Sequence, residues 1–100
     1  MQILMSIKRL WMHYKISLSK KYKQSYKKLN KQDRELVDNI VQKLSSNETL
    51  EAKYKDHALK GSYIGFRECH IKPDLLLIYR KQENILELYL ATLGNHNSVF

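Results

Sequence analysis

The segment that decides the fold is residues 55–74, which read KDHALKGSYIGFRECHIKPD. It holds two of the four histidines and two of the three glycines of the chain, and the apolar run LLLIY follows directly at residues 75–79. Titratable side chains beside an apolar strand that holds their geometry are the arrangement expected of a catalytic site. We therefore expect the functional site to be built around this segment.

Three strands are predicted in the second half of the chain. Residues 65–71 alternate, with Phe66, Glu68 and His70 on one face and Arg67, Cys69 and Ile71 on the other. After a turn at residues 72–74, residues 75–80 are nearly all apolar, as expected of a central strand covered on both faces. The last strand is predicted over residues 85–92, and short antiparallel hairpins join the three.

A strand and two helices are predicted in the first half. Residues 14–18 alternate as a half-buried strand, and Ser19 is a suitable N-cap for a helix over residues 20–29. A second helix over residues 31–45 carries one apolar stripe, formed by Leu36, Val37, Ile40, Val41 and Leu44. The pattern predicts an α+β fold in the order β-α-α-β-β-β, with a small antiparallel sheet and a helical hairpin packed on one face.

The connection between residues 45 and 63 has no sustained hydrophobic period. A loop of this length in a compact domain is usually either functional or a sign of a missed element. Because the connection carries His57, we interpret it as functional.

The composition limits the class of protein. One hundred residues suit a single domain, which we place at residues 13–100, and no apolar stretch approaches the roughly 20 residues of a membrane span. The lone Cys69 cannot form an internal disulfide, which fits a reducing cytoplasm, and its position predicts a buried small apolar residue. Residues 1–12 lack the order of a signal peptide, because Lys8 and Arg9 follow the apolar residues; we expect a loose N-terminal extension.

The net charge of +8 is unevenly distributed. Residues 1–55 carry thirteen Lys and Arg against five Asp and Glu, whereas residues 56–100 carry five of each. A basic half beside a near-neutral half indicates a polyanion that the first half holds and the second processes, either RNA or an acidic protein partner. The alternative is a basic surface that serves solubility alone.

Four residues are candidates for catalysis: His57, His70, Asp74 and His96. The hairpin pattern makes His70 and Asp74 neighbours, and His96 follows the last strand. Histidines that meet at one edge of a sheet suit acid–base chemistry near neutral pH. Together with the basic body and the lack of a phosphate-cradling glycine loop, they indicate RNA cleavage through the ribose 2′-hydroxyl.

Each histidine also has a simpler interpretation: His57 as a surface loop residue, His70 as a hydrogen-bonded strand residue and His96 as a polar tail residue. A zinc site made of the same histidines and Asp74 fits no usual close-paired ligand spacing. We therefore expect neither a metal nor a cofactor.

Four motifs occur together, namely DHALKG at residues 56–61, FRECHIKPD at 66–74, LLIY at 76–79 and LGNHNSVF at 93–100. In combination they closely resemble the YafQ branch of the RelE/ParE-type toxins, the toxin halves of bacterial type II toxin–antitoxin modules. The resemblance is strong from Tyr54 to Phe100, weaker but congruent over residues 14–50, and absent from residues 1–12.

The resemblance implies a RelE-like fold and a ribonuclease that enters the ribosomal A site and cuts the mRNA there, without a metal. It places His57, His70, Asp74 and His96 in the active site. His96 would be the general acid or base, His70 and Asp74 would orient or share the proton transfer, and His57 would contribute phosphate contact or charge. Phe100 matches a terminal aromatic residue that contacts RNA, and Lys60, Arg67 and Lys72 are the candidate cations.

The partners implied by the resemblance are an acidic RelB- or DinJ-like antitoxin, the ribosome and mRNA. Operator DNA would be reached only through the antitoxin complex, and no membrane is involved.

This sequence departs from the family pattern at one position that bears on activity. The family usually has an arginine four residues before its C-terminal histidine, whereas this chain has Thr92. A second class therefore stays open: a catalytically weakened binding protein that acts through its complex with antitoxin and operator DNA. A ParE-like gyrase inhibitor is a third class, and those relatives generally lack this set of histidines.

Overall fold

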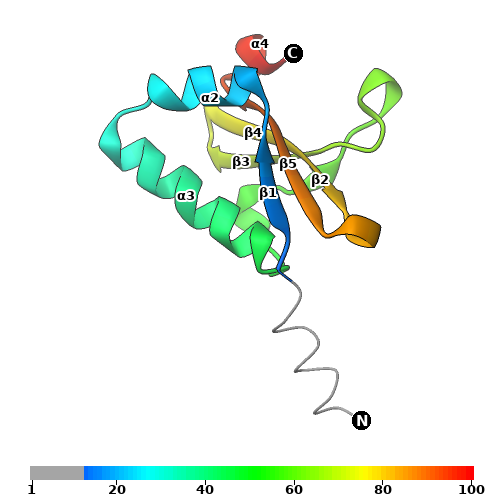
Figure 1. The fold of residues 1–100 in the computed structure, drawn as a ribbon. Coiled ribbons are helices and arrows are strands. Elements are labelled where there is room, and N and C mark those ends of the chain that lie inside the picture. Colours follow the sequence, from blue (N-terminus) through cyan, green and yellow to red (C-terminus); the bar gives the residue numbers. More distant parts are fainter. Residues whose placement is uncertain (1–12) are drawn as a thin grey trace.

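The computed structural model describes residues 13–100 (Figure 1). The elements are, in order, β1 (Lys15–Leu18), α2 (Lys20–Lys27), α3 (Lys31–Ser45), β2 (His57–Ala58), β3 (Arg67–Lys72), β4 (Leu75–Gln82), β5 (Glu87–Gly94) and α4 (His96–Val99). The predicted α+β class is confirmed, and the structure adds the two-residue strand β2 and the short helix α4. The expectation for residues 1–12 lies outside the described residues.

The five strands form one sheet in the order β1-β5-β4-β3-β2. Strands β3, β4 and β5 are antiparallel neighbours, as predicted, and β2 pairs antiparallel with β3, but β1 runs parallel to β5. The expected antiparallel sheet is therefore mixed at one edge. A parallel neighbour is compatible with the chain because the helices α2 and α3 separate β1 from the rest of the sheet in sequence.

Both long helices begin at a side-chain cap, of which Ser19 was predicted and Asn30 was not. The Tyr22 amide donates to Ser19 Oγ at 2.9 Å, and the Asp33 amide donates to Asn30 Oδ1 at 2.7 Å. Each bond satisfies one of the amides left free in the first turn of a helix. Helix α3 has the predicted bounds, whereas α2 ends at Lys27, two residues before the predicted end.

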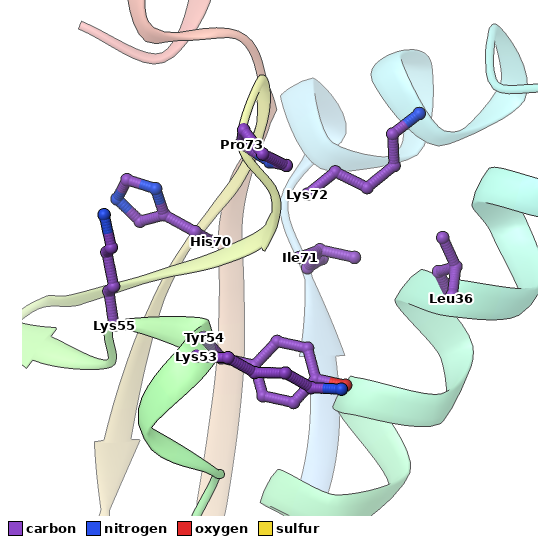
Figure 2. A pocket seen from close by; sticks show the side chains of 8 residues that line it. All are labelled: Leu36, Lys53, Tyr54, Lys55, His70, Ile71, Lys72 and Pro73. Carbon is purple, nitrogen blue, oxygen red and sulfur yellow. The ribbon is translucent and has the colours of Figure 1, made fainter.

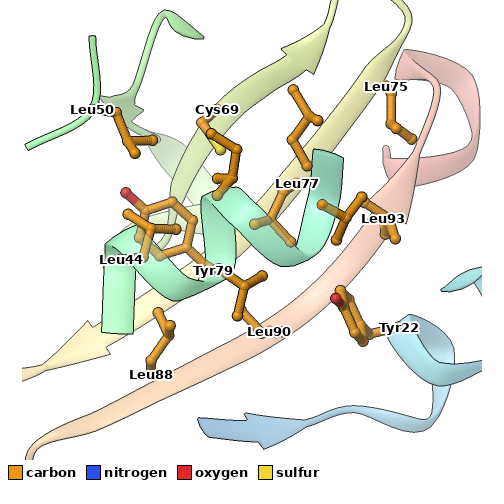
Figure 3. Packing of buried hydrophobic residues seen from close by; sticks show 14 of the residues in the cluster. Tyr22, Leu44, Leu50, Cys69, Leu75, Leu77, Tyr79, Leu88, Leu90 and Leu93 are labelled. Atoms are coloured by element: carbon orange, nitrogen blue, oxygen red, sulfur yellow. The ribbon is translucent and has the colours of Figure 1, made fainter. Parts of the chain in front are cut away.

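The main core lies between the helices and one face of the sheet (Figure 3). Strand β4 supplies Leu75, Leu77 and Tyr79 to this side, and Leu76 and Ile78 to the opposite face. The prediction of a central strand covered on both faces is thus confirmed. Cys69 is fully buried in the main core, and burial raises the pKa of its thiol to about 12, so the thiol stays protonated.

Three hydrophobic side chains that the sequence assigned to buried positions are exposed. Ile16 and Leu18 are each 41% exposed, because β1 is an edge strand. Leu36 is 43% exposed, although Val37, Ile40, Val41 and Leu44 of the same stripe are buried. Leu36 lies about 100° around the helix from Val37, which places it at the margin of the stripe that faces the sheet.

The last hairpin differs from the prediction by two residues. β4 continues to Gln82, a 3-10 turn occupies Glu83–Ile85, and β5 starts at Glu87 instead of residue 85. The chain turns back through Leu86, whose φ of 48° is a left-handed conformation. Because leucine rarely adopts this conformation, the sequence does not indicate a turn at this residue.

Two leucines on helix α3 test this packing. Replacing the buried Leu44 by alanine should lower the free energy of unfolding by about 2–5 kcal/mol, since it opens a cavity between helix and sheet. The same change at Leu36 should cost less than about 1 kcal/mol, since its side chain is already partly in water. Urea unfolding measures both, and equal losses at the two positions would contradict the packing described here.

Candidate active site

The segment that carries His57 is anchored to the sheet by Asp56. Asp56 Oδ1 accepts a hydrogen bond from the Tyr79 hydroxyl at 2.6 Å and one from Arg67 Nε at 3.2 Å. Burial, followed by the bond to Asp56, raises the pKa of Tyr79, so the phenol remains a donor. This anchor holds the next residue, His57, against β3, where it pairs with Glu68.

Glu68 is the centre of a cluster with two histidines. Its residue is only 6% exposed, and Oε1 lies 3.1 Å from His70 Nε2 and 3.6 Å from His57 Nε2. The two imidazole rings are 6.4 Å apart between centroids. A buried carboxylate needs a donor or a positive charge beside it, and here His70 Nε2 supplies the hydrogen bond while the His57 ring lies at ion-pair distance.

The hydrogen bonds define which ring nitrogen is engaged. His70 contacts Glu68 through Nε2, so an Nε2 proton donates to the carboxylate and Nδ1 is left outside this bond. His57 Nδ1 lies 2.6 Å from the Lys55 carbonyl oxygen, which can only accept, so Nδ1 carries a proton. Its Nε2, 3.6 Å from Glu68 Oε1, can then donate toward the carboxylate only when the ring carries both protons and is positively charged. The cluster therefore holds both rings in fixed orientations.

His96 is placed by the end of β5 and by helix α4. Gly94 has φ 154°, which favours glycine, and a Cβ atom at this position would collide with Ser98 Oγ unless that side chain moved. The Asn95 side chain caps the helical turn by accepting from the Ser98 amide at 2.9 Å. His96 is exposed, with its ring 5.1 Å from that of Phe100.

Helix α4 lies on the same face of the sheet as the Glu68 cluster. Val99 packs on Leu76 and Ile78, and Phe66 joins this smaller apolar cluster. His70 pairs with Leu76, which pairs in turn with Gly94. Two strand spacings of roughly 4.8 Å each therefore separate the backbones of His70 and Gly94. The structure brings His57 and His70 together and places His96 across β4 from them.

The remaining predicted residues lie in different surroundings. Asp74 is exposed in the β3–β4 turn. The prediction that Asp74 lies opposite His70 in the hairpin is wrong, because the strand partner of His70 is Leu76. Arg67 lies on the face opposite His70, as the alternation predicted, and its guanidinium forms an ion pair with Asp56. Lys72 Nζ is 3.1 Å from Asp33 Oδ1, and Lys60 is exposed. Phe100 is 46% exposed, with its ring 5.2 Å from that of Tyr63.

Sequence reasoning missed three residues that shape the site: Glu68, Asp56 and Tyr63. Alternation had already put Glu68 on the His70 face of the strand. The sequence did contain a signal for Glu68, because a carboxylate on a covered strand needs a cation or a hydrogen-bond donor beside it. The partners of Asp56 and Tyr63 are distant in sequence, and no local pattern indicates them.

Thr92 continues the row of residues that runs through Glu68. The register links His57 to Glu68, Glu68 to Ile78 and Ile78 to Thr92. Thr92 is 7% exposed, and its hydroxyl has no hydrogen-bond partner among residues 13–100. The position therefore supplies no positive charge and carries an unsatisfied polar atom.

Among the described residues, no group of three or more His, Cys, Asp and Glu side chains is arranged to hold a metal ion. Within residues 13–100, no helix combines the length and the apolar character that a membrane crossing requires.

Comparison with known proteins defines the class as a toxin of bacterial toxin–antitoxin systems. The family model described as the bacterial toxin of type II toxin-antitoxin system, YafQ, matches residues 14–100. The chain belongs to this YafQ family. The family named from the sequence motifs is thus confirmed.

Solved structures agree with this result. A metal-bound toxin from Helicobacter pylori is 43% identical with a TM-score of 0.79, and the match covers 87% of this chain and 99% of that one. YafQ in the DinJ–YafQ toxin–antitoxin complex from E. coli is 31% identical with a TM-score of 0.76, covering 88% and 98%.

Among curated relatives, the mRNA interferase toxin YafQ of Escherichia coli strain K12 is 41% identical over 51 residues, which are 51% of this chain and 53% of that protein. The chain spans about half the length of the curated relatives it matches.

The unsatisfied hydroxyl of Thr92 yields a prediction about stability. Thr92→Val keeps the shape and removes the hydroxyl, so the free energy of unfolding should rise by about 1 kcal/mol. The exposed Thr49 is the matched control, and Thr49→Val should change stability by less than about 0.5 kcal/mol. Urea unfolding gives both values. A Thr92→Val protein less stable than the parent would show that the hydroxyl has a partner in solution.

Proposed function

We propose that this protein is the toxin of a type II toxin–antitoxin module and acts as an endoribonuclease on mRNA, an mRNA interferase. The observation that carries the proposal is the buried Glu68 carboxylate between His57 and His70, on the sheet face that also bears His96. The name of the E. coli relative, mRNA interferase toxin YafQ, supports the same activity.

The proposed reaction is cleavage through the ribose 2′-hydroxyl. A base takes the 2′-hydroxyl proton, the 2′-oxygen attacks the adjacent phosphorus, and an acid gives a proton to the departing 5′-oxygen. The products are a 2′,3′-cyclic phosphate and a 5′-hydroxyl end. Two proton-transfer groups and a positive charge near the phosphate are sufficient for this route.

We assign the base to the Glu68–His70 pair. Glu68 holds the Nε2 proton of His70, which leaves Nδ1 as the nitrogen able to accept the hydroxyl proton. His96, exposed on the other side of Leu76, is the proposed acid. His57 lies between the Lys55 carbonyl and Glu68, and its proposed contribution is charge beside the phosphate.

RNA contacts are proposed at the margins of this centre. The exposed ring of Phe100 offers a stacking surface for a base, and Asp74 is proposed to orient the substrate from the adjoining turn. Among the candidate cations, Arg67 and Lys72 are engaged with Asp56 and Asp33. Lys60 forms no ion pair within residues 13–100, which makes it the preferred contact of the three.

The proposed place of action is the ribosome, reached through the basic helix α2 and its surroundings. Its lysines Lys20, Lys21, Lys23 and Lys27 are exposed, as is Lys28 after the helix, and they form a cationic surface suited to ribosomal RNA. The proposed inhibitor is an acidic antitoxin, in keeping with the DinJ–YafQ complex of the E. coli relative. Contact with operator DNA is proposed only through that complex.

One observation favours the second class, a toxin-fold protein that binds but cleaves weakly. Thr92 is buried and uncharged, so it cannot stabilise the phosphorane as the family's usual arginine would. A lost transition-state donor costs on the order of 10²–10³ in rate. The two candidates differ in whether the purified protein cuts mRNA on programmed ribosomes.

Substitutions at two histidines test the proposed reaction. His70→Ala and His96→Gln should each slow mRNA cleavage on programmed ribosomes by about 10²–10⁴-fold, because each removes one proton-transfer group. The exposed His13 is the control, and His13→Gln should cleave at the parent rate. Mapping of the 5′ ends of the cut mRNA gives both the rate and the position. Parent-like cleavage by both His70 and His96 variants would remove the assignment.

A further inference from the structure

A hollow of about 520 Å³ lies beside the Glu68 cluster, between helix α3, the end of β3 and the 3-10 turn Ala52–Tyr54 (Figure 2). We refer to it as the lysine pocket. It is lined by Leu36, Lys53, Tyr54, Lys55, His70, Ile71, Lys72 and Pro73. Its volume is in the range of sites that hold a small ligand or a single nucleotide unit.

The lysine pocket shares one wall with the proposed reaction centre. His70 lines the pocket and also contacts Glu68 with its Nε2 at 3.1 Å. In Figure 2, the His70 ring and the Lys55 side chain lie on the same side of the pocket. A chain that occupied the pocket would therefore pass directly beside the imidazole proposed as base.

The three lysines of the pocket differ in how far they are neutralised. Lys72 is bound to Asp33 at 3.1 Å, and Lys53 lies 4.0 Å from Glu51. Lys55 forms no ion pair with another residue of the range 13–100. The pocket thus has an excess of positive charge, with Lys55 as the cation available to a phosphate.

The backbone at Lys55 connects this cation to the histidine cluster. Lys55 has φ 49° and ψ 41°, a left-handed conformation that lysine rarely adopts. In that conformation its carbonyl oxygen lies 2.6 Å from His57 Nδ1, while its side chain lines the pocket with His70. Strained backbone that persists at such a position is typical of functional sites.

The other wall of the pocket is apolar. Leu36 is 43% exposed and lies with Tyr54, Ile71 and Pro73 around the hollow. These side chains offer a surface for a ribose and a base, whereas an ion alone would gain nothing from them. The helical stripe did not predict that Leu36 is exposed; contact with a ligand in this pocket would give the exposed side chain a role.

We propose that the lysine pocket binds the nucleotide of single-stranded RNA next to the scissile phosphate, with its phosphate at Lys55 and its ribose and base against Leu36 and Tyr54. The inference rests on the proposed function and deepens it by adding a subsite for the substrate. RNA is favoured over an acidic peptide because the pocket opens onto His70, and the combination of a free cation with an apolar wall suits a nucleotide unit.

Binding of a short, fluorescein-labelled single-stranded RNA with 2′-O-methyl riboses, which cannot be cleaved, tests the subsite. Lys55→Asn removes the ammonium and keeps a residue tolerant of the left-handed backbone. It should weaken binding roughly 5- to 10-fold and reduce the slope of log affinity against log salt by about 0.7, the value for one lost phosphate contact. Lys15→Gln, which removes an exposed lysine outside both the pocket and the basic surface around α2, should keep the parent salt slope.

A second pair of variants on helix α3 tests the apolar wall. Leu36→Glu places a negative charge in the pocket and should weaken binding at least as much as Lys55→Asn. Asn39→Glu adds the same charge at an exposed position of the same helix outside the pocket lining and should have less than half that effect on log affinity. Equal effects at both positions would show that only the overall charge matters and would overturn the subsite.

The outcomes separate this inference from the proposed function. If the parent protein cleaves mRNA on programmed ribosomes while Lys55→Asn binds the RNA probe with parent affinity and salt slope, the subsite is refuted and the ribonuclease proposal stands. If the parent neither binds the probe nor cleaves mRNA, both fail. Loss of binding to a poly-glutamate peptide in Lys55→Asn, with RNA binding unchanged, would assign the pocket to an acidic protein partner and also overturn the inference.

Discussion

The arrangement of the site depends on one buried carboxylate, Glu68. Leaving water costs an ionised carboxylate several kcal/mol unless a donor or a positive charge lies beside it; here His70 Nε2 donates to Glu68 and the His57 ring lies at ion-pair distance. The stabilisation is mutual: the two histidine rings stabilise the Glu68 carboxylate, and the carboxylate in turn holds the rings in position. Asp56 repeats the principle one residue before His57, where Tyr79 and Arg67 satisfy its carboxylate. Glu68 on β3 and Asp56 just before β2 therefore fix the position of His57 within the long connection.

The two faces of the sheet have different roles, one in stability and the other in the proposed chemistry. One face is covered by α2 and α3 and carries the main core, whereas the other holds the small cluster of Leu76, Ile78 and Val99 together with the polar site. β4 contributes to both faces, so the strand that stabilises the fold also determines the distance between His70 and the end of β5. Helix α4 has only one turn, and its Ser98 side chain occupies the space that a Cβ atom at position 94 would need.

The sequence predicted those features that local patterns determine. Periodicity located α3, the strands from β3 onward and the two faces of β3, and Ser19 caps α2 as predicted. It did not predict the parallel pairing of β1, the strand β2 or the left-handed turn at Leu86, because these arise from contacts between distant residues. The histidines were found as candidates, whereas Glu68 was not selected, since its importance depends on two rings that approach it from different strands. The exposure of Leu36 was not predicted either, because the apolar stripe of a helix does not show where the sheet beneath it ends.

The tautomer of His70 in solution tests the central claim most directly. If Glu68 holds this ring, long-range proton–nitrogen NMR correlations of the neutral imidazole will show the proton on Nε2, and Glu68→Gln will shift the population toward the other tautomer. A His70 ring protonated on Nδ1 in the parent protein, or a tautomer population that Glu68→Gln leaves unchanged, would contradict the account.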